Sequence, residues 1–269
     1  MFSSSKPGTT QRGLMVVALL EIDDVGVQFG GVNALDGLSF SIDEGQLAAL
    51  IGPNGAGKTT LFNVVSRIYE ADQGAVRFSG VDLLALAPHR IAELGVGRTF
   101  QNLALVPGLS VIDNVIVGAY SRSTGGFWAA ALRFPTISEE RRVAARAMEI
   151  LGRLDLAHLA HRPCAGLPFG TLKRIEFARA LAGEPRLLML DEPASGLTHG
   201  EVDELAELIR QIRSEFDLTV LLVEHHMSMV MALSEKIVVM DLGAKIAEGT
   251  PAEIRDDPAV ISAYLGASA

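Results

Sequence analysis

The chain has 269 residues, of which 49% are hydrophobic and 20% are charged. These proportions are ordinary for a globular protein and exclude wholesale disorder. The formal net charge of −9 argues against a domain-wide basic surface, so we expect no nucleic-acid partner. The single cysteine, Cys164, excludes an intramolecular disulfide framework and is typical of a reducing compartment.

The N-terminal region is polar and rich in small residues. We therefore predict a disordered tail over residues 1–14 and one folded domain over residues 15–269. The most apolar early run covers only residues 14–20, whereas a membrane span needs about 20 apolar residues. The sequence thus favours a location in the cytoplasm, with any membrane attachment through a partner.

Short apolar runs alternate with helical patterns, which is typical of an α/β fold. The first half predicts an antiparallel first sheet from residues 19–29 and 38–42, a strand over 46–51, a helix over 58–68 and a strand over 75–78. The second half predicts strands over residues 186–190, 219–223 and 236–240, and a helix over 201–215. The later strands are almost continuously apolar, as expected when helices or a second sheet cover both faces.

The middle of the chain has a different character. Residues 88–182 show helical patterns and almost no strand pattern. Ser110 and Asp113 predict a capped helix start, and a second helix is expected from Ser138. Residues 139–179 carry more basic than acidic residues, whereas residues 191–257 are acidic. We therefore predict a helical subdomain, about 88–182, inserted into an acidic α/β core.

A phosphate-binding pattern follows the strand over 46–51. The pattern G-x-x-x-x-G-K-[ST], followed by one more threonine, is matched by Gly52, Pro53, Asn54, Gly55, Ala56, Gly57, Lys58, Thr59 and Thr60. Glycines let the backbone N–H groups surround a phosphate, and the helix that follows adds its positive N-terminal dipole. In this pattern Lys58 reaches the β- and γ-phosphates and the Thr59 hydroxyl binds Mg²⁺. The alternative is an ordinary glycine-rich turn.

Two adjacent carboxylates, Asp191 and Glu192, follow a buried strand. Because side chains alternate along a strand, the two acids point in different directions. Asp191 is then suited to Mg²⁺ beside Thr59, and Glu192 to the water that attacks the γ-phosphate. The alternative is a strand end with two solvated acids.

Further motifs make the sequence resemble the ATP-binding subunit of ABC transporters. Residues 167–181 look like the signature loop and its helix, and residues 195–198 occupy the place of the D-loop. Gln101 matches the Q-loop, His225 the switch histidine and Phe29 the aromatic residue that stacks on adenine. Each single match has a plainer alternative: a surface amide, a satisfied polar residue and a core aromatic, respectively. His226 is the neighbour most easily confused with the switch histidine.

The resemblance implies an α/β P-loop core with an antiparallel β subdomain and an inserted helical subdomain. It also implies ATP and Mg²⁺ as cofactors, with Thr59, Gln101 and Asp191 at the metal. Two copies, or this chain and a related ATPase, would enclose ATP, and Gly170 and Thr171 would contact the nucleotide bound by the opposite subunit. Glu192, His225 and Gln101 would act in hydrolysis and in its coupling to a permease.

The sequence departs from the family pattern at three positions. Pro168 stands where the family has the signature serine, Thr171 replaces its glutamine, and Thr198 replaces the D-loop aspartate. Proline offers neither a hydroxyl nor an N–H group. The phosphate contact is therefore expected from Gly170, nearby backbone N–H groups and a helix that opens near Thr171.

Residues 98–101, 224–227 and 249–266 further resemble branched-chain amino acid importers. This resemblance implies transmembrane permease subunits, a solute-binding protein and a location on the cytoplasmic face of the membrane. The aromatic residues Phe127, Trp128 and Phe134 belong either to a locally packed loop or to a permease contact. Urea, amides or another small organic solute remain alternative cargoes. Outside transport, the sequence also leaves open a non-transport ABC ATPase and a regulatory module that binds ATP without hydrolysing it.

Overall fold

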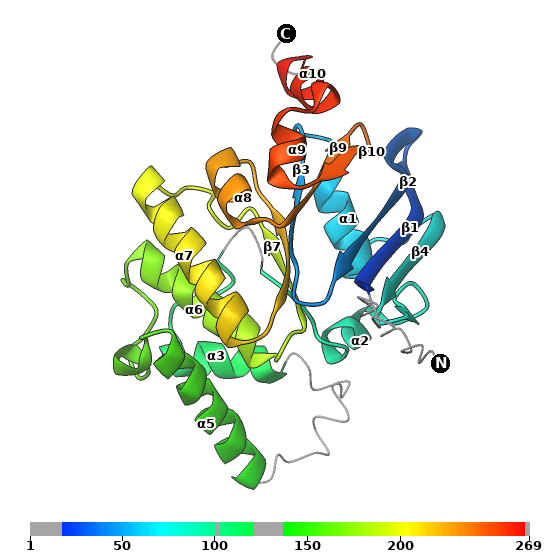
Figure 1. Cartoon of the computed structure of the whole chain (residues 1–269). Coiled ribbons are helices and arrows are strands. Elements are labelled where there is room, and N and C mark those ends of the chain that lie inside the picture. The colour runs from blue at the N-terminus through cyan, green and yellow to red at the C-terminus, as the bar shows by residue number, and fades with distance from the viewer. Residues whose placement is uncertain (1–17, 100–102, 121–136, 267–269) are drawn as a thin grey trace, which may run out of the picture.

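The computed structural model describes residues 18–99, 103–120 and 137–266, and its centre is a six-stranded sheet (Figure 1). The strand order is β10–β9–β3–β8–β7–β6. These strands are β3 (Leu47–Ile51), β6 (Val96–Arg98), β7 (Leu187–Asp191), β8 (Thr219–Val223), β9 (Lys236–Asp241) and β10 (Ala244–Gly249). All neighbours pair in parallel except β9 and β10. The predicted α/β fold is confirmed.

A second sheet is antiparallel, as predicted, and has the order β2–β1–β4–β5. Its strands are β1 (Ala18–Phe29), β2 (Val32–Asp43), β4 (Gln73–Phe78) and β5 (Val81–Asp82). β2 begins six residues before the predicted start at 38. The reason is a tight hairpin: Gly30 and Gly31 both have positive φ, 53° and 89°, so Phe29 pairs directly with Val32.

Helices cover both faces of the core sheet. They are α1 (Lys58–Val65), α2 (Pro88–Glu93), α3 (Val111–Tyr120), α5 (Ile137–Arg153), α6 (Phe169–Ala182), α7 (His199–Glu215), α8 (Met227–Leu233), α9 (Pro251–Arg255) and α10 (Pro258–Gly266), with a 3₁₀ turn η1 (Ala157–Leu159). α1 ends three residues before the predicted end at 68, because Arg67 adopts a left-handed φ of 57°. None of the helices in the described ranges is long and apolar enough to cross a membrane.

The apolar strands divide their side chains between two layers of core. Leu188 and Leu190 of β7 pack with α3, α5, α6 and α7, whereas Leu187 and Met189 pack with the antiparallel sheet and α1. A continuous apolar run is the pattern that this arrangement requires, because successive side chains enter opposite cores. α1 and α6 consequently lie on opposite faces of the core sheet.

The described part of residues 88–182 is mainly helical, but it also contains a strand that the sequence did not predict. β6 pairs in parallel with β7, and Val96 lies opposite Leu187. A three-residue strand that contains Gly97 is too short to show a strand period. The capped start of α3 is present, since the Asp113 N–H donates to Ser110 Oγ at 3.2 Å. The inserted subdomain with bounds 88–182 stays a prediction, and the predicted tail lies outside the described residues.

Candidate nucleotide site

The phosphate loop, residues 52–60, connects the end of β3 to α1. Gly52 has φ 152°, and a Cβ atom there would lie 2.1 Å from the Met240 carbonyl oxygen. Gly57 has φ 100°, and its Cβ would lie 2.4 Å from the Ala34 carbonyl oxygen. Both the backbone conformation and the close approach require glycine at these two positions. The loop is therefore built from backbone that is packed tightly against β9 and β2.

The Lys58 ammonium folds back into this loop. Its Nζ donates to the carbonyl oxygens of Gly52 at 2.7 Å and Pro53 at 3.0 Å. Burial lowers the pKa of Lys58, while the carboxylates of Glu192 and Asp191 act in the opposite direction. The cation thus lies close to both acids at the carboxyl edge of the core sheet. Thr59 is exposed beside it and Thr60 is partly buried.

Asp191, at the end of β7, is buried and paired with Arg98 of the neighbouring strand β6. Arg98 Nη2 lies 2.8 Å from Asp191 Oδ2, and its Nη1 donates to Asn63 Oδ1 of α1 at 2.8 Å. The guanidinium also lies over the Phe62 ring, 5.4 Å from its centroid. Arg98 therefore fixes the acidic strand end against α1. Sequence reasoning gave Arg98 no role at the site, because its partners are distant along the chain.

Glu192 follows directly and has a left-handed backbone, with φ 46°. A non-glycine residue in this region costs about 1–3 kcal/mol, and such strain is concentrated at functional sites. The Glu192 N–H donates to the Val223 carbonyl oxygen at the end of β8, at 2.9 Å. The turn is thereby tied to the strand that leads into His225.

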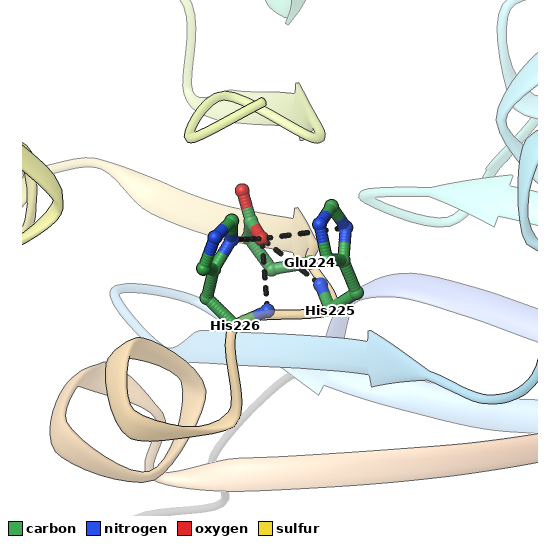
Figure 2. Close-up of side chains that lie close together, drawn as sticks. All are labelled: Glu224, His225 and His226. Carbon is green, nitrogen blue, oxygen red and sulfur yellow. Dashed lines mark hydrogen bonds and ion pairs between the residues drawn. The ribbon is translucent and has the colours of Figure 1, made fainter. Parts of the chain in front are cut away.

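The switch segment, residues 224–227, holds its two histidines differently, although their ring centroids lie only 4.5 Å apart (Figure 2). His226 Nδ1 lies 3.0 Å from the buried Glu224 carboxylate, and 25% of the His226 side chain is exposed. His225 Nδ1 is 3.9 Å from the same oxygen, too far for a hydrogen bond, and 59% of its side chain is exposed. His226 is anchored, whereas His225 extends to the surface at the edge that carries Lys58 and Glu192.

The signature loop, residues 167–171, leads into α6. Pro168 caps the helix with φ −56°, and the first bond runs from the Leu172 N–H to the Pro168 carbonyl oxygen at 3.0 Å. The helix therefore begins at Phe169, and the expected opening near Thr171 is wrong by two residues. The fixed φ of proline and its missing N–H suit the start of a helix. Gly170 and Thr171 lie in the first turn, and nothing lies within 4 Å of a Cβ placed on Gly170.

The D-loop departure, Thr198, caps α7. Its N–H and its hydroxyl donate to a Glu201 carboxylate oxygen at 2.8 and 2.7 Å. These two hydrogen bonds lower the pKa of Glu201. Thr198 thus has a clear helix-capping role at the position where the family has aspartate.

Two further aromatic residues are relevant to the candidate site. Phe29, at the end of β1, is 47% exposed and meets Tyr69 edge to face, with ring centroids 5.2 Å apart. Burial raises the pKa of Tyr264 in α10, and a hydrogen bond from the Gly52 backbone acts against this shift. Sequence reasoning did not connect Tyr264 with the phosphate loop. Gln101 and the aromatic residues Phe127, Trp128 and Phe134 lie outside the described residues.

A phosphate loop, two acids on adjacent positions and a switch histidine at one sheet edge define the P-loop nucleoside triphosphatase class. Comparisons specify this class further. Residues 35–195 match the family described as ABC transporter, and residues 244–269 match the branched-chain amino acid ATP-binding cassette transporter family.

Similar proteins match over most of their length. The high-affinity branched-chain amino acid transport ATP-binding protein BraF of Pseudomonas aeruginosa is 41% identical, covering 92% of this chain and 98% of BraF. LivG of Escherichia coli K12, a protein with the same description, is 38% identical over the same shares. A crystal structure of the ADP conformation of an ABC transporter ATP-binding cassette has a TM-score of 0.82 at 30% identity, covering 93% of this chain and 99% of that one.

The chain therefore belongs to the ABC transporter family, to its ATP-binding proteins of branched-chain amino acid transporter type. It is the ATP-hydrolysing subunit of a transporter that has several components.

Proposed function

We propose that ATP binds at residues 52–60 and that its hydrolysis powers the import of branched-chain amino acids. The observation that carries the proposal is the match to BraF over 92% of this chain, together with the match of residues 244–269 to the branched-chain amino acid cassette family. The loop geometry supports the nucleotide site, because glycine backbone and a half-buried lysine suit a row of phosphates.

In this proposal the β-phosphate lies in the loop, and phosphate oxygens replace the two carbonyl oxygens that Lys58 contacts. The fixed N-terminus of α1 adds its dipole to the site. Thr59 offers a hydroxyl oxygen and Asp191 a carboxylate, which are oxygen ligands of the kind that Mg²⁺ prefers. Gln101 is the third proposed metal ligand. Phe29, whose ring is exposed, is proposed to stack on adenine.

Glu192 is proposed to orient and deprotonate the attacking water, and His225 to contact the γ-phosphate. The strained backbone of Glu192 supports this role, because it turns the side chain away from the direction taken by Asp191. The exposure of His225 leaves its imidazole able to reach a nucleotide.

The γ-phosphate is proposed to meet α6 of a second ATPase subunit, either a copy of this chain or a related one. α6 and α1 lie on opposite faces of the core sheet, and we propose that the first turn of α6 serves the phosphate loop of the partner subunit instead of its own. In a pair of subunits, the exposed first turn at Gly170 and Thr171 presents N–H groups and a positive dipole to the phosphate bound by the partner.

The permease is proposed to dock at a groove of about 320 Å³ between α2 and β6 on one side and α3 and α6 on the other. Its lining includes Ile91, Val96 and Ala180, together with the charged residues Arg98 and Arg179. Thr99 also lines the groove and lies two positions before Gln101, so a helix seated there would connect to the nucleotide site. Docking to a permease would place the chain on the cytoplasmic face of the membrane, with a solute-binding protein on the other face.

The proposed cargo is tested by measuring amino acid uptake in cells that lack this protein. Cells deleted for the gene should lose uptake of labelled leucine, isoleucine and valine, and the wild-type gene should restore it. The Lys58→Ala gene, expressed at the same level, should not. Uptake of urea and acetamide in the same cells is the control. Loss of urea or amide uptake with unchanged leucine uptake would contradict the proposed cargo.

A further inference from the structure

The Glu224 carboxylate lies between the end of β8 and the start of α8 and has no exposed side-chain surface. A buried carboxylate needs compensating hydrogen bonds, because the cost of removing a charge from water is large. The neighbouring histidines lie on either side of it (Figure 2).

Four donors satisfy this carboxylate. Oε1 accepts the backbone N–H of Ala194 at 2.7 Å. Oε2 accepts the backbone N–H groups of His225 at 2.9 Å and His226 at 3.2 Å, and it lies 3.0 Å from His226 Nδ1. These hydrogen bonds surround the Glu224 carboxylate and connect it to the backbone on both sides. Bonds to an ionised acceptor are also stronger than neutral ones.

The two oxygens of Glu224 join two segments that are distant along the chain. Ala194 lies inside the turn that Glu192 opens, since the Ser195 N–H donates to the Glu192 carbonyl oxygen at 3.1 Å. The Glu192 N–H in turn donates to the Val223 carbonyl oxygen at 2.9 Å, one residue before Glu224. The turn that begins at Glu192 and the switch segment are thus connected at two adjacent points.

We propose that Glu224 is a positioning residue that sets the separation between Glu192 and His225. The proposal rests on the roles proposed above for those two residues. Glu224 holds the backbone on both sides, and by engaging the His226 ring it leaves His225 as the histidine that extends toward the nucleotide. A displacement of either segment would pass to the other through this carboxylate.

Only a carboxylate of this length fits the arrangement. Glutamine keeps the shape, but its NH₂ group is a donor and would face either the Ala194 N–H or the N–H pair of the switch segment. Aspartate is one methylene shorter and cannot span both segments. We therefore expect Glu224→Gln to misplace the reacting groups while the phosphate loop stays intact.

The test is steady-state ATP hydrolysis by the purified protein, with ATP affinity measured separately. Glu224→Gln should lower kcat by about 100-fold, the scale of a 1 Å misplacement, with little change in KM or ATP affinity. Glu253→Gln is the matched control: Glu253 accepts the N–H and hydroxyl of Thr250 in the cap of α9, away from the site. It should keep the wild-type kcat.

A double variant separates positioning from simple destabilisation. If Glu224 acts through the placement of His225, then the double variant Glu224→Gln, His225→Ala should lose less kcat than the product of the two single losses, because coupled residues are not additive. His226→Ala removes one of the four contacts and should give a folded protein with an intermediate kcat. Wild-type kcat in Glu224→Gln, or fully multiplicative losses in the double variant, would overturn the proposal. Wild-type turnover in Glu192→Gln would instead overturn the role of the base itself.

Discussion

At the scale of single residues, Lys58 and Glu192 divide the proposed chemistry between binding and hydrolysis. Lys58 is held inside the phosphate loop by two carbonyl oxygens, and burial lowers its pKa. The phosphates of a nucleotide would give this cation the negative partners that a buried charge requires. Glu192 lies beyond the loop on another strand end, so its removal leaves the loop unchanged.

Paired substitutions test this division. Lys58→Ala should weaken ATP binding by at least about 10-fold, since a hydrogen bond to a charged group is worth about 1.5–3 kcal/mol. Glu192→Gln should bind ATP with wild-type affinity but lower kcat by about 10²–10⁴-fold, because an amide is a poor base. Equilibrium binding and hydrolysis assays measure the two effects. Undiminished ATP affinity in Lys58→Ala would contradict the placement of the phosphates.

The tight backbone of the phosphate loop was predictable from the sequence because the loop is a local pattern. The glycines at 52 and 57 and the helix after them follow one another along the chain. Arg98 and Glu224 were missed because their significance depends on tertiary partners: Asp191 is 93 positions from Arg98, and Ala194 is 30 positions from Glu224. A lone arginine or glutamate in the sequence carries no sign of such a partner.

At the scale of elements, α3 and α6 pack at a glycine. A Cβ atom on Gly118 of α3 would lie 1.9 Å from the Arg179 carbonyl oxygen of α6. The two helices therefore approach each other backbone to backbone at this point, beside the groove proposed for the permease. Any side chain there must push α3 away from α6 or distort both.

Two glycine-to-alanine substitutions in helices should have opposite effects. Gly118→Ala should reduce the free energy of unfolding by about 1–3 kcal/mol, the usual cost of overpacking. Gly152→Ala in α5 meets nothing within 4 Å and should raise it by about 0.5–1 kcal/mol, because alanine favours a helix. Urea unfolding followed by circular dichroism measures both. Equal stability of the two variants would contradict the close approach of α3 and α6.

The first turn of α6 gives a second test at this scale. Gly170→Asp adds a negative charge where the partner's phosphate is proposed to bind, and it should abolish ATP-driven pairing of subunits. Aspartate is favourable in the first turn of a helix, so the fold should be kept. ATP binding to the single subunit should also be kept, because its own phosphate loop belongs to another part of the chain, between β3 and α1. Pro168→Ser, which restores a hydroxyl, should pair normally.

Light scattering with and without ATP measures this pairing. Every protein in this measurement also carries Glu192→Gln, so that bound ATP is hydrolysed slowly. If the Gly170→Asp variant pairs at the same ATP concentration as the protein with Gly170, the first turn of α6 is not the phosphate contact. The helix start itself was predicted two residues late, because the family pattern located the loop but gave no information on the cap that Pro168 forms.

At the scale of the whole molecule, the strand patterns predicted the architecture. Apolar runs such as β7 and β8 require cover on both faces, and the structure provides it with two separate cores. β6 and the early start of β2 were not predictable, because a three-residue strand and a Gly-Gly hairpin carry little periodicity. The two acids, Lys58 and His225 gather at one edge of the sheet because β3, β7 and β8 are parallel. The carboxyl ends of parallel strands lie on the same side.

The proposed nucleotide site is tested most directly by a structure of the Glu192→Gln variant with ATP and Mg²⁺. We expect two subunits, with the β-phosphate inside residues 52–60, Mg²⁺ on Thr59 and Asp191, and adenine on the Phe29 ring. The γ-phosphate should face His225 of its own subunit and the first turn of α6 of the partner. ATP bound to a single subunit with adenine away from Phe29, or a pair of subunits with α6 remote from the phosphates, would contradict the proposed site.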